Sequence, residues 1–361
     1  MSKHIGSFDG IRVILTALIF INHLNFWQDY PLKNVFENIF HNGQFSVMLF
    51  FMISGFFYQY GLKYLKDGFD INQYKKYLRG KFLQLGVPYL LAEIAAFLFQ
   101  IIRLGGHITS EHAIYFLKGV VLSLTMTKSW ISTNFWGVGN ADGWYISSLF
   151  LIYIIAPSAL YLFKKMRLDT TSVFVQSCIC LIINIVVVAV WGNNIQLLYI
   201  SPFYRMIHFW AGFSLRMQFE KSVCQEFNRT RATIVECSLL VFVIVTYFVT
   251  IGHADNRWVD VIQFIPFGVL IYFCAQNQGR ISDFLGCKLF RTLQPFCLYF
   301  YLCHYEIIFE IFGLYPGEAK YRCSGPVFTT LLVLIVSLCV SYYYRKVHML
   351  IINRFMVCKE Q

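Results

Sequence analysis

The segment FDGIRVILTALIFINH, from Phe8 to His23, is apolar except for a few polar side chains, among them Arg12 and His23. A cation and an imidazole are costly to place in a membrane, so together they predict a functional site. The 11-residue step between them corresponds to roughly 16 Å of helix, about half of a hydrocarbon core roughly 30 Å thick. We therefore expect a membrane-spanning helix with His23 near mid-depth and Arg12 near the edge, where its side chain can reach the interface.

The rest of the chain is also strongly apolar. Of its 361 residues, 57% are hydrophobic and only 14% are charged, and the mean hydropathy is +0.56. Soluble domains carry nearer a quarter of charged residues. We predict an all-α, polytopic membrane protein in which residues 1–361 form one integral membrane domain with no appended soluble domain. About ten transmembrane helices are expected, over residues 10–28, 44–62, 82–103, 143–163, 172–191, 197–215, 233–251, 258–275, 293–313 and 326–344.

The charge of the loops predicts the orientation of these spans. With ten spans, most of the 30 lysines and arginines fall on one side, which in membrane proteins is the cytoplasmic side. Both termini are therefore predicted to be cytoplasmic. This bias also accounts for the net charge of +11 without a nucleic-acid partner. The long stretch 104–142 contains an apolar piece, 113–126, that we interpret as an interfacial or re-entrant helix. The alternative is an eleventh span, which would invert every later loop.

Three histidines are predicted to lie at a similar depth: His23, His208 and His304. A neutral imidazole is a good general base for removing a hydroxyl proton, and His23, with Arg12 in its span, is the strongest candidate. His304 is equally consistent with a catalytic and a structural role. For His208 we expect a structural role, with hydrogen bonds to a neighbouring helix. The eleven cysteines show neither a CxxC pair nor a zinc-ligand spacing, so no metal site is expected.

Two further segments carry candidate functional features. In LFFMISGFF, Leu49 to Phe57, the pair Ser54–Gly55 is small enough to allow close helix packing. The sequence KKYLRGK, Lys75 to Lys81, follows in a predicted cytoplasmic loop. Its basic residues are candidates for binding an anionic headgroup or a phosphorylated ligand, although the positive-inside bias alone would place them there. They are Lys76, Arg79 and Lys81.

Glu93 is an acid inside the predicted third span, and Glu306 is one inside the ninth. Either of them could orient a histidine or bind a substrate hydroxyl, and the sequence does not choose between them.

In their order along the chain, these segments resemble the acyltransferase-3 family of integral membrane acyltransferases. FDGIR is similar to the family's LDGLRG opening, and Arg12 with His23 fits its Arg-x10-His pattern. LFFMISGF resembles its LFFxLSGF element. The other matches are GWYISSLFLIYIIAP (143–157) to the WFL-then-proline segment, Arg205 with Phe209 and Gly212 to R-x-x-x-F-x-x-G, and LYFYLCH, with Tyr301 and His304 in register, to the SYSIYLxH helix.

The chain departs from the family pattern at two places. The family's Arg-x-x-Arg before the proline of the third span falls here on Lys81 and Gln84, so the contact with the acyl donor is expected to be altered or shifted. Two serine positions of the last motif are occupied by Cys297 and Tyr299, which puts the hydroxyl contribution of that helix in doubt.

The resemblance implies O-acylation, most often acetylation, of a cell-envelope or extracellular polysaccharide. Acetyl-CoA on the cytoplasmic side would be the donor, and the protein would reside in the cell membrane, as a multi-pass protein of the bacterial cytoplasmic membrane. His23 and Arg12 would be catalytic. Catalytic or substrate-binding roles of second rank fall to His304, Arg205, Tyr301 and Glu306, and the donor would be bound by Lys76, Arg79 and Lys81. A transporter or exporter of glycans or lipid-linked precursors remains the main alternative, and a scaffold protein is a weaker one.

Overall fold

The computed structural model describes residues 4–29, 43–58, 70–104, 110–131, 135, 137–165, 173–192, 194, 196–221, 228–250, 256–314 and 325–357. All the regular structure in these residues is helical, which confirms the predicted all-α fold. The longer helices are α1 (Ser7–Asn22), α3 (Gly43–Phe56), α5 (Ile71–Lys81), α6 (Val87–Leu104), α7 (Ser110–Leu124), α9 (Gly143–Lys165), α10 (Val173–Trp191), α11 (Pro202–Lys221), α12 (Arg229–Thr250), α13 (Trp258–Gln276), α16 (Cys297–Glu306) and α17 (Pro326–Val357).

Short helical segments connect several of these helices. They are η1 (Asn25–Asp29), η2 (Phe82–Gly86), α8 (Lys128–Ile131), η5 (Gln196–Ile200), α14 (Arg280–Leu285), α15 (Lys288–Leu293), η6 (Gln294–Phe296) and η7 (Ile307–Ile311).

Five helical stretches in the described part of the chain are long and apolar enough to cross a membrane. They are Ile71–Arg103, Gly143–Leu162, Arg229–Thr250, Trp258–Gln276 and Pro326–Arg354. Three shorter apolar helices cover Gly43–Phe56, Ala113–Leu124 and Val175–Trp191. A helix lies within each of the ten predicted spans, although residues 59–62 of the second span fall outside the described residues. The count of ten spans and the cytoplasmic termini stay predictions.

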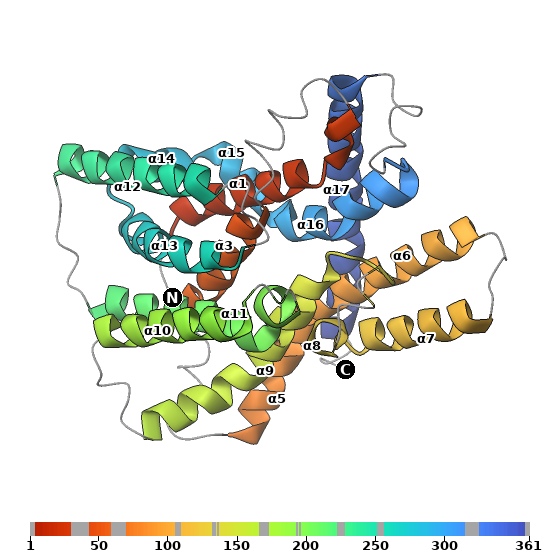
Figure 1. Ribbon diagram of the computed structural model, residues 1–361, viewed down its shortest axis with the longest axis horizontal. Helices are drawn as coiled ribbons and strands as arrows, with labels where there is room; N and C mark the ends of the chain where they lie inside the picture. The colour runs from red at the N-terminus through yellow and green to blue at the C-terminus, as the bar shows by residue number, and fades with distance from the viewer. Residues whose placement is uncertain are drawn as a thin grey trace.

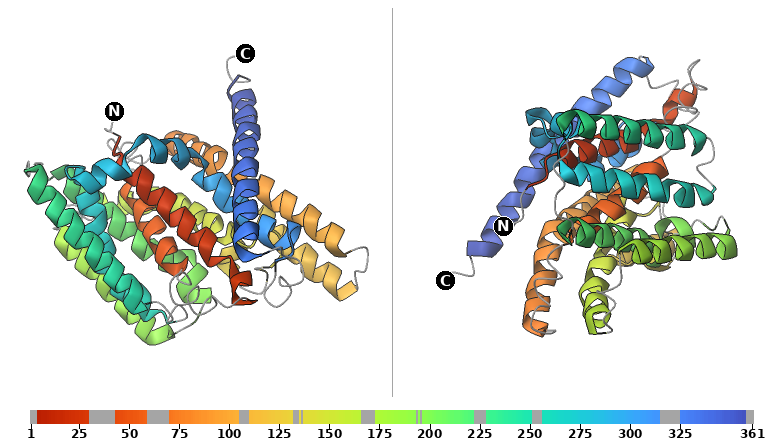
Figure 2. Two further views of the ribbon diagram at one scale, coloured as in Figure 1. Left: turned by 90° about the horizontal axis from the view of Figure 1, so that it is seen from above. Right: turned by 90° about the vertical axis from the view of Figure 1, so that its left-hand side faces the viewer.

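The helices form a bundle that the long helix α17 crosses, upright in Figure 1 and oblique in the right-hand view of Figure 2. Helices α10 and α11 pack together, as do α12 and α13, while α6 and α7 form a pair on the opposite flank. Helix α1 lies between these groups and contacts α3, α13 and α16. The start of α1 and the end of α17 lie on the same side of the bundle (Figure 2).

Helices α3 and α11 cross at their backbones, as the small residue at position 55 predicted. A Cβ atom added at Gly55 would overlap the carbonyl oxygen of Phe209, and one added at Gly212 would overlap that of Met52. Glycine on both helices therefore allows a contact that any side chain would prevent. This crossing fixes α11 against α3 in the centre of the bundle.

The first helix is shorter than the predicted span 10–28. It ends at Asn22, and His23 is its C-cap, with the backbone N–H of His23 still bonded to the carbonyl of Ile19. The side chain of Asn22 accepts the N–H of Gly43 instead of facing outward. Polar side chains of this kind compete with helical hydrogen bonds and favour turns. His23 thus lies at a helix end, and not in the middle of a long span.

Candidate active site

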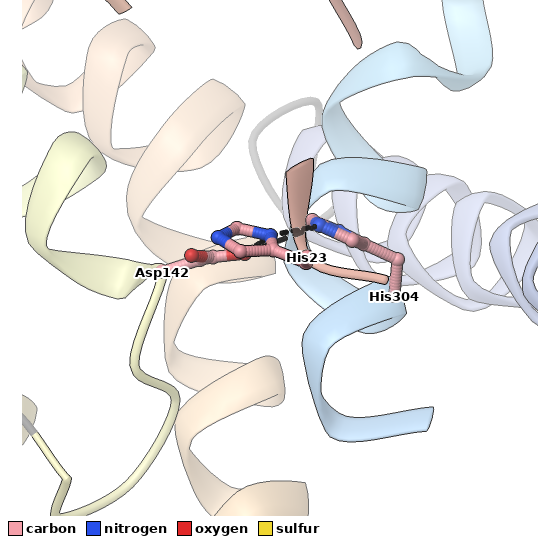
Figure 3. Close-up of side chains that lie close together, drawn as sticks. All are labelled: His23, Asp142 and His304. Atoms are coloured by element: carbon pink, nitrogen blue, oxygen red, sulfur yellow. Dashed lines mark hydrogen bonds and ion pairs between the residues drawn. The ribbon is translucent and has the colours of Figure 1, made fainter. Parts of the chain in front are cut away.

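Three side chains from distant parts of the chain meet at the end of α1 (Figure 3). Nδ1 of His23 lies 2.9 Å from Nε2 of His304. Oδ2 of Asp142 lies 3.4 Å from that same Nε2 and 3.8 Å from Nδ1 of His23. His23 caps α1, Asp142 directly precedes α9, and His304 lies in α16. His23, Asp142 and His304 therefore form a trio of titratable side chains that come from three separate parts of the chain.

The hydrogen bonds of His304 determine how protons are arranged in this trio. Nδ1 of His304 lies 2.9 Å from the carbonyl oxygen of Tyr301 and 3.1 Å from that of Phe300. Because carbonyls only accept, this nitrogen carries the proton and Nε2 carries the lone pair. Nδ1 of His23 therefore donates to Nε2 of His304. In the neutral ring of His23, the basic lone pair is then on Nε2.

The trio is shielded from solvent to different degrees. His304 and Asp142 are buried, whereas the side chain of His23 keeps 20% of its exposure. Burial raises the pKa of the Asp142 carboxyl to about 8, with nearby Lys128 acting in the opposite direction. An imidazolium that forms at His23 favours the ionised form of this carboxyl, because an opposite charge within about 4–6 Å does so. The trio can therefore accept a proton at His23 and stabilise the imidazolium that results.

The same three groups also form a possible set of metal ligands. Their ligand atoms all lie within 4.8 Å of one another, and two imidazoles with a carboxylate suit zinc. The hydrogen bond between the imidazoles and the fixed tautomer of His304 satisfy the same atoms without an ion. Oδ2 of Asp142 is the atom that an ion would serve best, since it accepts no hydrogen bond from the described residues.

A cavity of about 680 Å³ runs along α1 toward the trio. Arg12, Thr16 and Ile19 line it on successive turns of α1, and Ile19 is one turn before His23. The opposite wall comes from α3, α9, α16 and α17, including Tyr145, Tyr153, Cys297, Tyr301 and His348. The cavity thus connects the region of Arg12 with the turn next to the histidines.

Arg12 is placed in this cavity and not against His23. Its guanidinium lies 4.7 Å from the ring centre of Phe57 and it lines the cavity together with Thr16. The distance along α1 to His23 is about 16 Å at about 1.5 Å per residue. Of the two roles predicted for Arg12, positioning the histidine or binding the donor, the geometry favours binding an anionic part of the donor.

Among the predicted donor-binding residues, Lys81 is placed beside the same cavity. Lys76 and Arg79 are exposed on α5. Nζ of Lys81 lies 4.1 Å from the ring centre of Tyr153, a cavity-lining residue, and Gln84 lines the cavity directly. The positive end of the cavity is therefore formed by the end of α5 and by Arg12.

Tyr301 and Glu306 lie on the same helix as His304. The hydroxyl of Tyr301 donates to the backbone carbonyl of Asp142 at 2.8 Å, and its ring lines the cavity. Glu306 is buried. Its Oε2 atom has no hydrogen-bond partner among the residues that the structure describes. Among the described residues, hydrogen bonding thus links Tyr301, but not Glu306, to the trio.

Arg205 belongs to a separate buried cluster. Its Nη1 atom lies 3.2 Å from Oδ2 of Asp260, and its Nε donates to the carbonyl of Tyr199 at 2.7 Å. The other oxygen of Asp260 accepts a hydrogen bond from Gln44. These bonds join α3, α11 and α13, so they give Arg205 a role in holding the helices together. His208, one turn on, is fully buried, and within the described part of the chain neither ring nitrogen makes the hydrogen bond expected of it.

Asp142 is the member of the trio that sequence reasoning missed. The two acids singled out were Glu93 and Glu306, which lie inside apolar segments. Asp142 lies in the loop that leads into GWYISSLF. Acids are common in loops, so hydropathy does not single this one out. Its position directly before an element shared with a known family is the signal that could have identified it.

Comparison with known proteins gives one result. A family model described as an acyltransferase domain matches residues 5–346, nearly the whole chain. No curated protein and no solved structure matches the chain.

Proposed function

The chain belongs to the acyltransferase-3 family of membrane acyltransferases, and we propose that it transfers an acetyl group from acetyl-CoA to a hydroxyl of a cell-envelope polysaccharide. The observation that carries the proposal is the cavity along α1, which leads from a cation to a histidine-based general base. Both ends of that cavity are chemically suited to a long anionic thioester.

The shape and charge of the cavity support a CoA thioester as the donor. Such a donor has a long, thin pantetheine arm with phosphates at one end and the thioester at the other. Arg12 and Lys81 lie at the positive end, and guanidinium groups match phosphate geometry well. The aromatic and aliphatic walls between that end and Ile19 suit the arm. The thioester carbonyl is then delivered one turn of α1 away from His23.

The trio supplies the proton transfers of the reaction. Nε2 of His23 removes the proton of the acceptor hydroxyl as its oxygen attacks the thioester carbonyl. A carbon–oxygen bond forms, the carbon–sulfur bond breaks, and the imidazolium gives its proton to the leaving thiolate. His304 holds the ring of His23 through its lone pair, and Asp142 stabilises the imidazolium. Protons balance without any external acid or base.

A transport assay separates this proposal from the glycan exporter. Purified protein in proteoliposomes is given labelled acetyl-CoA on one side and polysaccharide or its lipid-linked precursor on the other. We expect base-labile acetyl label on the polysaccharide, and no movement of precursor in the absence of acetyl-CoA. Precursor movement without acetylation would instead make the protein an exporter.

Removal of metal is expected to leave the transfer rate unchanged. Nδ1 of His23 and Nε2 of His304 already satisfy each other by hydrogen bonding, so the general-base reaction needs no ion. The measurement is the initial rate of acetyl transfer before and after dialysis against a chelator, with metal content read by mass spectrometry. Stoichiometric zinc, and loss of rate that zinc restores, would instead assign the trio as a metal site.

A further inference from the structure

We propose that a buried ion pair between Lys128 and Glu93 holds Asp142 beside the histidines, so that both act as positioning residues for acyl transfer. The inference rests on the proposed function, because it gives these residues a part in that reaction. Neither side chain reaches the trio itself. They act on the loop 137–142, which carries Asp142 at its end.

Lys128 directs two of its three ammonium contacts to this loop. The residue, at the start of α8, is 1% exposed. Nζ lies 3.3 Å from Oε1 of Glu93, and it donates to the carbonyls of Val138 at 3.1 Å and Asn140 at 2.6 Å. An ammonium has three donors, so all are accounted for. Burying a cation is costly unless it is paired in this way, and here two of its three bonds go to the backbone of one short loop.

Two side chains of helix α6, Glu93 and Gln100, also bind the backbone of this loop. Oε2 of Glu93 accepts the backbone N–H of Asn140 at 2.9 Å. Two turns further along α6, the amide of Gln100 accepts the N–H of Gly139 and donates to the carbonyls of Gly137 and Gly139. The backbone from 137 to 140 is therefore held by side chains at almost every polar atom.

Hydrogen bonds of the Asn140 side chain connect this restrained backbone to Asp142. Its Oδ1 atom accepts the backbone N–H of Asp142 at 3.0 Å, and its Nδ2 donates to the carbonyl of Leu302 in α16. The hydroxyl of Tyr301 binds the carbonyl of Asp142. Both backbone groups of Asp142 are thus fixed, and they are fixed to the helix that carries His304. Rotation or retreat of the Asp142 carboxyl requires breaking this chain of bonds.

Gly139 allows the carboxylate of Glu93 to lie directly against the backbone of the loop. Gly139 has a φ of +72°, and a Cβ atom there would overlap Oε2 of Glu93. An L-residue at this position is strained in backbone conformation and also displaces the carboxylate. Loop and ion pair therefore form one unit that tolerates little change at either partner.

Kinetics of Lys128→Met separate positioning from general stability. We expect kcat for acetyl transfer to fall about 10- to 100-fold, since misplacing a catalytic group by an ångström costs that much. KM for acetyl-CoA should stay within about twofold, because no residue of the loop lines the donor cavity. Rates are normalised to monodisperse protein. The matched control is Glu236→Gln, which alters a buried acid that accepts backbone N–H groups near α14 and the hydroxyl of Ser282, and its kcat should equal that of the wild type.

A double-mutant cycle tests whether Lys128 acts through Asp142. In an Asp142→Ala background, Lys128→Met should lower kcat by less than about threefold further. The reason is that the effects of substituting coupled residues are not additive. Full additivity, or a wild-type kcat in Lys128→Met, would overturn the inference. If Lys128→Met fails to fold, Glu93→Gln/Lys128→Met removes both charges together and is read by the same criteria. Wild-type protein that transfers no acetyl group would refute the proposed function instead.

Discussion

Asp142→Ala is expected to lower kcat for acetyl transfer about 10²- to 10³-fold while KM for acetyl-CoA changes little. The carboxylate lies 3.8 Å from Nδ1 of His23 and 3.4 Å from Nε2 of His304. It therefore stabilises the imidazolium that exists only during the reaction, and its loss acts on kcat and not on donor binding. Removing the carboxylate that supports a catalytic histidine has effects of this order or larger.

Steady-state kinetics on protein in nanodiscs give this result directly. Asp142→Asn is the companion variant, because it keeps the size of the side chain and removes only its charge. We expect the two variants to be similarly impaired, because an amide cannot ionise when the imidazolium forms. A wild-type kcat in both would remove Asp142 from the mechanism and leave His23 and His304 as an isolated pair.

Arg12→Gln is expected to raise KM for acetyl-CoA about 10- to 100-fold, with a smaller effect on kcat. Arg12 lines the cavity about three turns of α1 from His23, so it contacts the anionic part of the donor and not the thioester. A charge-assisted contact to phosphate contributes roughly 1.5–3 kcal/mol, which corresponds to this range. Uniform loss of binding raises KM and spares kcat.

A truncated donor makes this prediction specific. Acetyl-pantetheine carries the thioester and the arm but lacks the nucleotide phosphates. Wild type and Arg12→Gln should use it with equal kcat/KM. If the variant remains impaired with acetyl-pantetheine, Arg12 acts on the arm, the reacting group or the fold, and its assignment to phosphate binding is wrong.

Sequence reasoning succeeded where a single segment carries the information. Hydropathy placed a helix within each of the ten segments, and the small residue at 55 predicted a close helix contact that Gly55 and Gly212 indeed make. Helix formation depends on neighbours within a few turns, and the small side chain at 55 allows a close contact whichever helix is the partner. The ends of the helices were harder, because the turn after Asn22 depends on a bond to Gly43 that hydropathy does not register.

The site itself depends on contacts between residues far apart in the sequence. His23 and His304 are 281 positions apart, and a shared depth in the membrane does not by itself bring two side chains into contact. His208 has a similar predicted depth but lies in the cluster of α11, beside Tyr204 and Phe264. Glu93 was noticed as a buried acid, but its partner Lys128 was not, because a lysine in a loop looks like a solvated charge until the fold buries it.

Acetyl transfer by purified His23→Ala tests the central claim most directly. Wild type and variant, reconstituted at equal amounts, are given labelled acetyl-CoA and the polysaccharide acceptor, and donor binding is measured in parallel. The account predicts that transfer falls about 10²- to 10⁴-fold, the range for loss of a general base, while acetyl-CoA still binds, since His23 lies beyond the cavity that holds it. Transfer at the wild-type rate in His23→Ala would contradict the account.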